Sequence, residues 1–132
     1  MSAKTFFKPT RKKKIKKLVI RGELSSLNEH DNANRNNRYA GAALKKKETE
    51  RVFWECRSQK LTVILKPVKI DFNWYTKDIR KDPDNVSFAK KYILDGLIEA
   101  GVLVNDTREY IKGFTDSFHI SKDNPRIEVI IK

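Results

Sequence analysis

The sequence lacks the residues that several classes of site require. With Cys56 as its single cysteine, it cannot form an internal disulfide or supply a cysteine-based zinc site, which favours a reducing compartment. The two histidines, His30 and His119, are far apart in the chain, which argues against a nuclease built on clustered histidines. No apolar run approaches the roughly eighteen residues of a membrane span, and no secretory apolar segment follows the basic N-terminus. We therefore expect a cytoplasmic protein that does not enter a membrane.

Acidic residues are absent from the first 22 positions, which hold nine lysines and arginines of a chain with net charge +12. This excess favours a polyanionic partner such as nucleic acid, or an anionic membrane surface as the weaker alternative. The run "TRKKKIKK" (10–17) is typical of a solvated arm or of a phosphate-binding tail, and the residues leave both open. We expect a flexible basic arm over 1–16, with Lys12, Lys13 and Lys14 as DNA contacts, and one domain over 17–132.

The order of apolar patterns predicts an α+β fold, with a mixed β-sheet and two main flanking helices in a single domain. A polar stretch without apolar periodicity, 25–41, is predicted to be a long loop. The helix over 42–59 is expected to bury Val52, Phe53, Trp54 and Cys56 near its end. The helix over 86–100 is expected to end at Gly101. Strands are predicted at 17–24, within 60–76, near 108–113 and at 126–132.

The predicted loop at 25–41 contains side chains suited to DNA. Asn28, Arg35 and Arg38 can bind phosphates, and Tyr39 can stack on a base. A surface loop without function is the competing interpretation.

The clearest chemical signal is "DPDN" (82–85), which places two aspartates around Pro83 immediately before a helix. Asp84 at a helix start can cap free N–H groups, and this structural role explains one of the two. Asp82 is not explained in this way. Because neighbouring carboxylates repel each other unless a cation neutralises them, the pair also fits Mg²⁺, which binds one or two carboxylates together with waters and phosphates. Asp106, in "NDT", could return alongside as a third ligand.

The stretch "KDPDNVSFAKKYILDGLIEAGVLVNDTREYIKGF" resembles the core of the RusA-type Holliday-junction resolvases. That family shows an acidic D-x-D-N motif, a following lysine, a D-x-L on the same helix, A-G at its end and a further D-D or N-D. The upstream "SLNEHDNANRNNRYAG" and the closing "NPRIEVII" are also similar to family segments, so the resemblance covers about residues 17–132.

The resemblance implies a homodimeric endonuclease that resolves four-way DNA junctions with Mg²⁺, or with Mn²⁺ as a substitute, in recombination and repair. It assigns metal binding to Asp82, Asp84 and Asp106 and an essential role to a lysine. It also implies a bacterial or phage-encoded, nucleoid-associated protein. A non-catalytic or architectural nucleic-acid-binding protein that uses the basic arm is the alternative.

Two departures from the family pattern concern the catalytic residues. Asn105 stands where the family has the first aspartate of D-D, and a few extra residues separate the acidic motif from the lysine, so Lys90 and Lys91 compete for the role. On an uninterrupted helix from Asp84, Lys91 lies about 20° from Asp84 and Lys90 about 120° away. This geometry predicts Lys91 as the active lysine. The resemblance implies the same residue, because the family lysine precedes the aspartate of D-x-L, here Asp95, by four residues. Asp116 is a further candidate acid.

Overall fold

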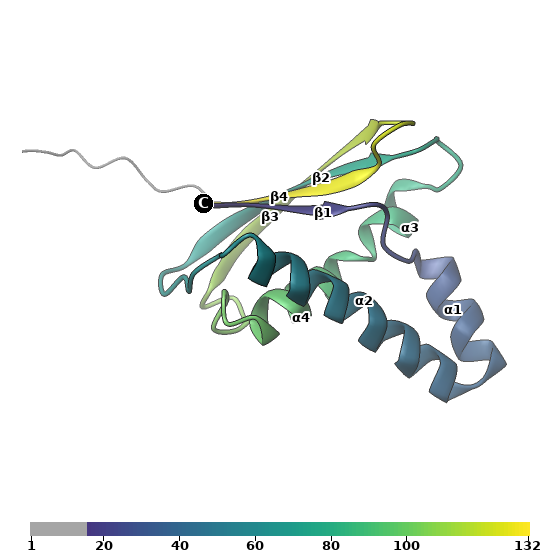
Figure 1. Ribbon diagram of the computed structural model, residues 1–132, viewed down its shortest axis with the longest axis horizontal. Helices are drawn as coiled ribbons and strands as arrows, with labels where there is room; N and C mark the ends of the chain where they lie inside the picture. The colour runs from purple at the N-terminus through teal and green to yellow at the C-terminus, as the bar shows by residue number, and fades with distance from the viewer. Residues whose placement is uncertain (1–15) are drawn as a thin grey trace, which may run out of the picture.

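A four-stranded mixed sheet in the order β1-β4-β2-β3 forms one layer of the computed structural model, which describes residues 16–132 (Figure 1). β4 pairs antiparallel with both β1 and β2, whereas β2 and β3 run parallel. The strands are β1 (Lys16–Arg21), β2 (Val68–Thr76), β3 (Ile111–Ile120) and β4 (Arg126–Ile131).

The helices form the second layer and lie on one side of the sheet in Figure 1. They are α1 (Leu27–Asn36), α2 (Arg38–Ser58), α3 (Pro83–Ser87) and α4 (Lys90–Glu99). The expected α+β fold is therefore confirmed, with α2 and α4 as the two main flanking helices and α1 and α3 in addition. None of the helices in this part of the chain is long and apolar enough to cross a membrane.

Strict alternation along the central strands builds the core. In β2, Val68, Ile70, Phe72 and Trp74 are buried while the residues between them are at least partly exposed. The side chains of one face therefore pack against the helices, and the opposite face stays open. Where α2 crosses α4, a methyl group on Gly96 would lie 2.5 Å from the Val52 side chain, so the glycine allows the close approach.

The prediction that 25–41 is a loop is wrong, because this segment forms α1 and the beginning of α2. Ser26 and Glu29 form a capping box at the start of α1: the Ser26 side chain accepts from the Glu29 N–H, and the Glu29 carboxylate accepts from the Ser26 N–H. Asn37 then caps α2 through a 2.7 Å bond from the Ala40 N–H. Local capping thus supports helices in a stretch that has no apolar periodicity.

Other boundaries also move. The first strand begins at Lys16, whose ammonium donates to the Thr62 carbonyl at 2.9 Å, so the expected arm loses its last residue to the sheet. Of the expected strand region at 60–76, only β2 is a strand, and Ile64 forms an isolated bridge to Leu103. The expected strand near 108–113 begins at Ile111 and continues to Ile120, and the final strand is confirmed as β4.

The helix predicted over 86–100 is divided into α3 and α4. At the junction the chain makes short-range bonds, with the Ala89 N–H donating to the Val86 carbonyl and the Lys91 N–H to the Phe88 carbonyl. The assumption of an uninterrupted helix from Asp84 is therefore wrong. The predicted end is confirmed, since Gly101 follows α4 with φ of +75°, a conformation that favours glycine.

Candidate nuclease site

The two aspartates of the "DPDN" motif lie at the start of α3, one on each side of Pro83. Asp82 occupies the N-cap position but makes no side-chain capping bond, and Asp84 lies in the first turn. Both residues are exposed, and neither carboxylate has an ion-pair or hydrogen-bond partner among residues 16–132. The cap interpretation thus fails at the level of hydrogen bonding, although negative charge at a helix start remains favourable.

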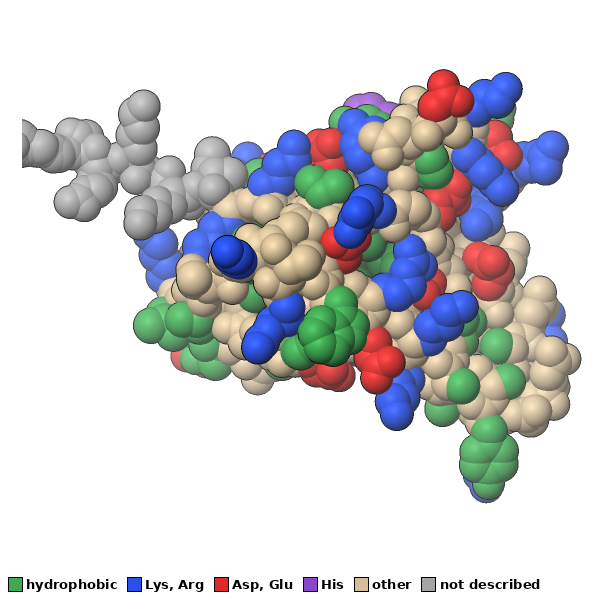
Figure 2. Space-filling model, viewed as in Figure 1, with side chains coloured by type: hydrophobic (Ala, Val, Ile, Leu, Met, Phe, Trp, Pro, Cys, Tyr) green, Lys and Arg blue, Asp and Glu red, His purple; other side chains and the backbone are tan. Residues whose placement is uncertain are grey.

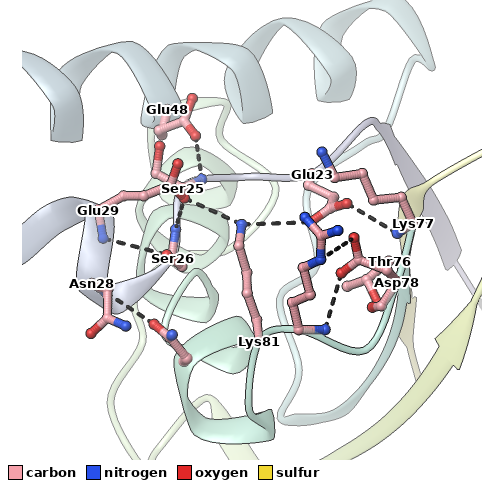
Figure 3. A network of polar contacts seen from close by, with 12 residues as sticks. Glu23, Ser25, Ser26, Asn28, Glu29, Glu48, Thr76, Lys77, Asp78 and Lys81 are labelled. Atoms are coloured by element: carbon pink, nitrogen blue, oxygen red, sulfur yellow. Dashed lines mark hydrogen bonds and ion pairs between the residues drawn. The ribbon is translucent and has the colours of Figure 1, made fainter.

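A polar network holds this motif against the start of α1 (Figure 3). The Lys81 ammonium lies 3.7 Å from a Glu23 oxygen and 3.4 Å from a Glu29 oxygen. Burial alone would raise the pKa of Glu29, but hydrogen bonds from Ser26 and the Lys81 charge outweigh it and lower that pKa. The network fixes the position at which the chain enters the motif.

The motif's asparagine is part of the same connection. Asn85 Oδ1 accepts a 2.9 Å hydrogen bond from the backbone N–H of Asn28, in the first turn of α1. Since the early N–H groups of a helix have no partner within the helix, Asn85 acts as a cap supplied from a distant segment. The acidic motif and α1 are therefore joined directly.

A second cluster forms around Lys91 on α4. Its ammonium lies 3.2 Å from an Asp95 oxygen, the expected (i, i+4) pair, and 3.7 Å from an Asp106 oxygen. The hydrogen bond with Asp95, reinforced by the charge of Asp106, raises the pKa of Lys91 above its ordinary 10.5. Lys91 is therefore protonated at neutral pH. It can supply positive charge or donate a proton but is not placed to act as a base.

The other lysine, Lys90, points in a different direction and is paired with Asp116. Lys90 Nζ lies 2.8 Å from one Asp116 oxygen, and Trp74 Nε1 donates to the other at 2.8 Å. Asp116, a candidate fourth acid, is thus engaged by two partners. Trp74 is buried, whereas Trp54 is 65% exposed, so the prediction that the helix over 42–59 buries Trp54 is wrong.

The three predicted metal ligands are all carboxylates, a ligand type that Mg²⁺ accepts. No three His, Cys, Asp or Glu side chains within residues 16–132 form a group that could hold a metal ion, and the three-aspartate site stays a prediction. The carboxylates of Asp82 and Asp84 do match Mg²⁺ chemically, because this ion commonly takes one or two carboxylates and completes its shell with waters and substrate phosphates. Of the four predicted catalytic residues, the structure brings Lys91 and Asp106 together as a contact pair.

The DNA contacts predicted within 25–41 lie on helices α1 and α2. Asn28 and Arg35 are exposed on α1, while Arg38 begins α2 with its guanidinium 5.5 Å from the Tyr39 ring. Tyr39 is 74% exposed at the α1–α2 junction, which projects beyond the sheet in Figure 1. Lys12, Lys13 and Lys14 lie outside the described residues. Figure 2 shows lysine and arginine side chains spread over the visible face with acidic side chains among them.

Within residues 16–132, neither histidine belongs to a group of three His, Cys, Asp or Glu side chains that could hold a metal ion. The ring of His30 packs 5.1 Å from that of Phe88, and the ring of His119 stacks on Tyr75. The structure therefore gives both histidines aromatic neighbours.

The comparisons with known proteins give no family. A scan against protein-family models finds no match, and no curated protein matches the chain.

Proposed function

We propose that this protein is a Mg²⁺-dependent, structure-specific endodeoxyribonuclease that resolves four-way DNA junctions as a homodimer. The observation that carries the proposal is the 3.7 Å ion pair between Lys91 and Asp106. These positions are separated by most of α4 and a loop, and the family resemblance assigns a catalytic role to each. The sequence shows only the order of the two motifs that contain these residues. Their contact shows that the two motifs also lie next to each other in space.

In this proposal each charged group has a defined part. Asp82, Asp84 and Asp106 would hold Mg²⁺, which supplies positive charge at the scissile phosphate and an activated water for phosphodiester hydrolysis. Lys91 stabilises the negative charge that develops on the leaving oxygen or gives that oxygen its proton. Asp95 and Asp106 keep the lysine charged and orient its side chain.

The homodimer accounts for two cuts in one junction, since a two-fold axis presents one site to each of two strands. Exposed apolar side chains on β3 support such an interface. Phe114 and Phe118 are 42% and 43% exposed, and Ile120 is 59% exposed, on the sheet face that the helices otherwise cover. Large apolar side chains gathered on one strand are typical of a surface that another protein chain covers.

The decisive experiment compares a synthetic four-way junction with a linear duplex of matched sequence, each with and without Mg²⁺. We expect paired nicks in the junction only, and only with the metal. Asp82→Asn, Asp84→Asn and Asp106→Asn should each abolish cleavage while junction binding survives or tightens, because less negative charge repels the phosphates.

Asp123→Asn is the matched control, since Asp123 is exposed in the turn between β3 and β4. This variant should cleave normally. Near-normal cleavage by all three site variants would refute the site, and Mg²⁺-independent junction binding without any cleavage would favour the architectural alternative.

A further inference from the structure

Three planar side chains stack in a row across the open face of the sheet, opposite the helices. Tyr75 on β2 is the middle member, because the register pairs it with Arg126 on β4 and with His119 on β3. The Arg126 guanidinium lies 3.8 Å from the centroid of the Tyr75 ring. On the other side, the Tyr75 and His119 rings lie 4.6 Å apart with an interplanar angle of 21°.

The inner end of this column is held firmly. Arg126 Nε donates to a Glu128 oxygen at 2.8 Å, and its Nη1 donates to the Asn124 carbonyl at 3.1 Å. A guanidinium fixed in this way keeps its plane against Tyr75, and Tyr75 in turn supports the imidazole. The column is therefore ordered without any ligand.

The outer end of the column is open. Within residues 16–132, β3 is an edge strand whose single neighbour is β2, and His119 is exposed. One face of the imidazole rests on Tyr75, and the next position in the stack lies beyond the sheet edge. A further planar group of similar size can continue the row there.

The charge of the open face matches a nucleic-acid backbone. Alternation along the strands places four basic side chains on this face against two acidic ones, Asp71 and Glu128. The basic residues are Lys17, Lys69, Arg126 and Lys132. Stacked planar side chains beside positive charge are what proteins use to hold unpaired bases and the phosphates between them.

The column also lies at the end of the sheet from which the acidic motif departs. β2 ends at Thr76, whose hydroxyl bonds to the Asp78 carbonyl at 2.8 Å, and the chain then leads to Asp82. The column is thus at the carboxyl ends of the two parallel strands, where α/β proteins commonly place ligands.

We propose that an unpaired base of single-stranded DNA stacks on the outer face of His119 and extends the Arg126–Tyr75–His119 column. The inference rests on the proposed function only in naming DNA as the nucleic acid. In a four-way junction, such a base would come from the unstacked crossover.

The test uses the full chain without Mg²⁺, so that binding is separate from cleavage. The probe is a single-stranded oligo(dT) that carries one 2-aminopurine, whose fluorescence falls when the base stacks. We expect quenching by the wild type. His119→Ala should abolish the quenching and weaken binding about 5- to 150-fold, the range for loss of one stacked base. His119→Phe should keep both, because it retains a flat ring.

Ser117→Ala is the matched control, on the same strand and face but without a planar side chain. The inference would be overturned if His119→Ala quenched the fluorescence as strongly as the wild type, or if Ser117→Ala lost as much quenching as His119→Ala. A duplex that carries the same 2-aminopurine should be insensitive to His119→Ala, and equal sensitivity of duplex and single strand would also overturn it. If the wild type does not cleave the junction but still quenches 2-aminopurine through His119, the proposed function is wrong and the stacking site is supported.

Discussion

The ammonium of Lys90 lies 2.8 Å from the Asp116 carboxylate and 4.7 and 5.1 Å from the ring centroids of Phe114 and Phe72. The adjacent ammonium, that of Lys91, belongs to a different cluster with Asp95 and Asp106. Lys90 therefore ties the first turn of α4 to the sheet, whereas Lys91 faces the side of the helix on which the proposed chemistry takes place. The two lysines can be separated by experiment.

Lys90→Ala should lower the free energy of unfolding by about 1–2 kcal/mol, between the values for exposed and buried ion pairs. The reason is that Asp116, with 27% of its side chain exposed, would lose its cation while remaining against the aromatic rings. Urea unfolding followed by tryptophan fluorescence measures the change. Lys122→Ala, in the exposed β3–β4 turn, is the control. Equal stability of the two variants would show that the Lys90–Asp116 contact contributes nothing.

Lys91→Ala should instead reduce junction cleavage about 100-fold or more, the scale of a lost acid catalyst. Folding and metal-free junction binding should persist, because the Lys91 side chain is 54% exposed. Single-turnover cleavage is the measurement. Lys91→Arg separates the two possible roles, since it keeps the positive charge but does not give up a proton at neutral pH. If Lys90→Ala and Lys91→Ala lowered the cleavage rate by the same small factor, the ion pairs of Lys91 would be surface contacts without a role in cleavage.

Periodic and spacing signals predicted some of these features. The (i, i+4) spacing of Lys91 and Asp95 is enough to place them together, and Gly101 predicted the end of α4. The Lys90–Asp116 contact could not be predicted, because it depends on the parallel register that sets Phe72 opposite Asp116. A one-residue change in that register would turn Asp116 to the open face.

The missed helix α1 has another cause. It contains no buried residue, so it gives no apolar stripe, and its residues resemble those of a loop. Its signal was the Ser26 and Glu29 pair, spaced as a capping box, and the remaining support comes from packing against α2 and from the Asn85 side chain. The Asn85 contact spans 57 positions, which a single sequence does not reveal.

Stability should depend on acid pH through Glu55. Burial alone would raise the pKa of Glu55, but hydrogen bonds from the backbone N–H and guanidinium of Arg21 outweigh it and hold that pKa below its ordinary 4.5. Because the folded pKa is depressed, the stabilisation is present above about pH 4.5 and is lost as the pH falls through the folded pKa. Glu55→Gln should lower the urea midpoint at pH 7, and the difference from wild type should shrink at pH 3.

Glu109→Gln provides the comparison, since Glu109 is exposed in the turn before β3. It should behave as wild type at both pH values. A Glu55→Gln difference that stayed constant from pH 7 to pH 3 would exclude the carboxylate charge as its source.

Deletion of residues 1–15, which stops before β1, removes six lysines and arginines and no acid. We expect weaker binding to both junction and duplex and a smaller slope of log affinity against log salt, because phosphate contacts release counterions. Preference for the junction should persist, since phosphate contacts carry little information on shape. Titrations of both DNAs at several salt concentrations test this, and an unchanged slope would show that the segment does not contact DNA.

The last prediction concerns the homodimer and the apolar strip of β3. Sedimentation at micromolar concentration should give about twice the chain mass for the wild type. Phe118→Glu should shift it to the monomer, because a charge would be buried in the interface without a partner. Leu65→Glu is the control: Leu65 is 73% exposed and apolar but lies outside β3, so this variant should remain a dimer.

Phe118→Glu should also change the cleavage pattern. A dimer can cut both strands of one junction at once, so the Phe118→Glu monomer should make single nicks in place of paired ones. A wild-type monomer that still made paired nicks would refute the two-fold arrangement, and a dimer unaffected by Phe118→Glu would move the interface away from β3.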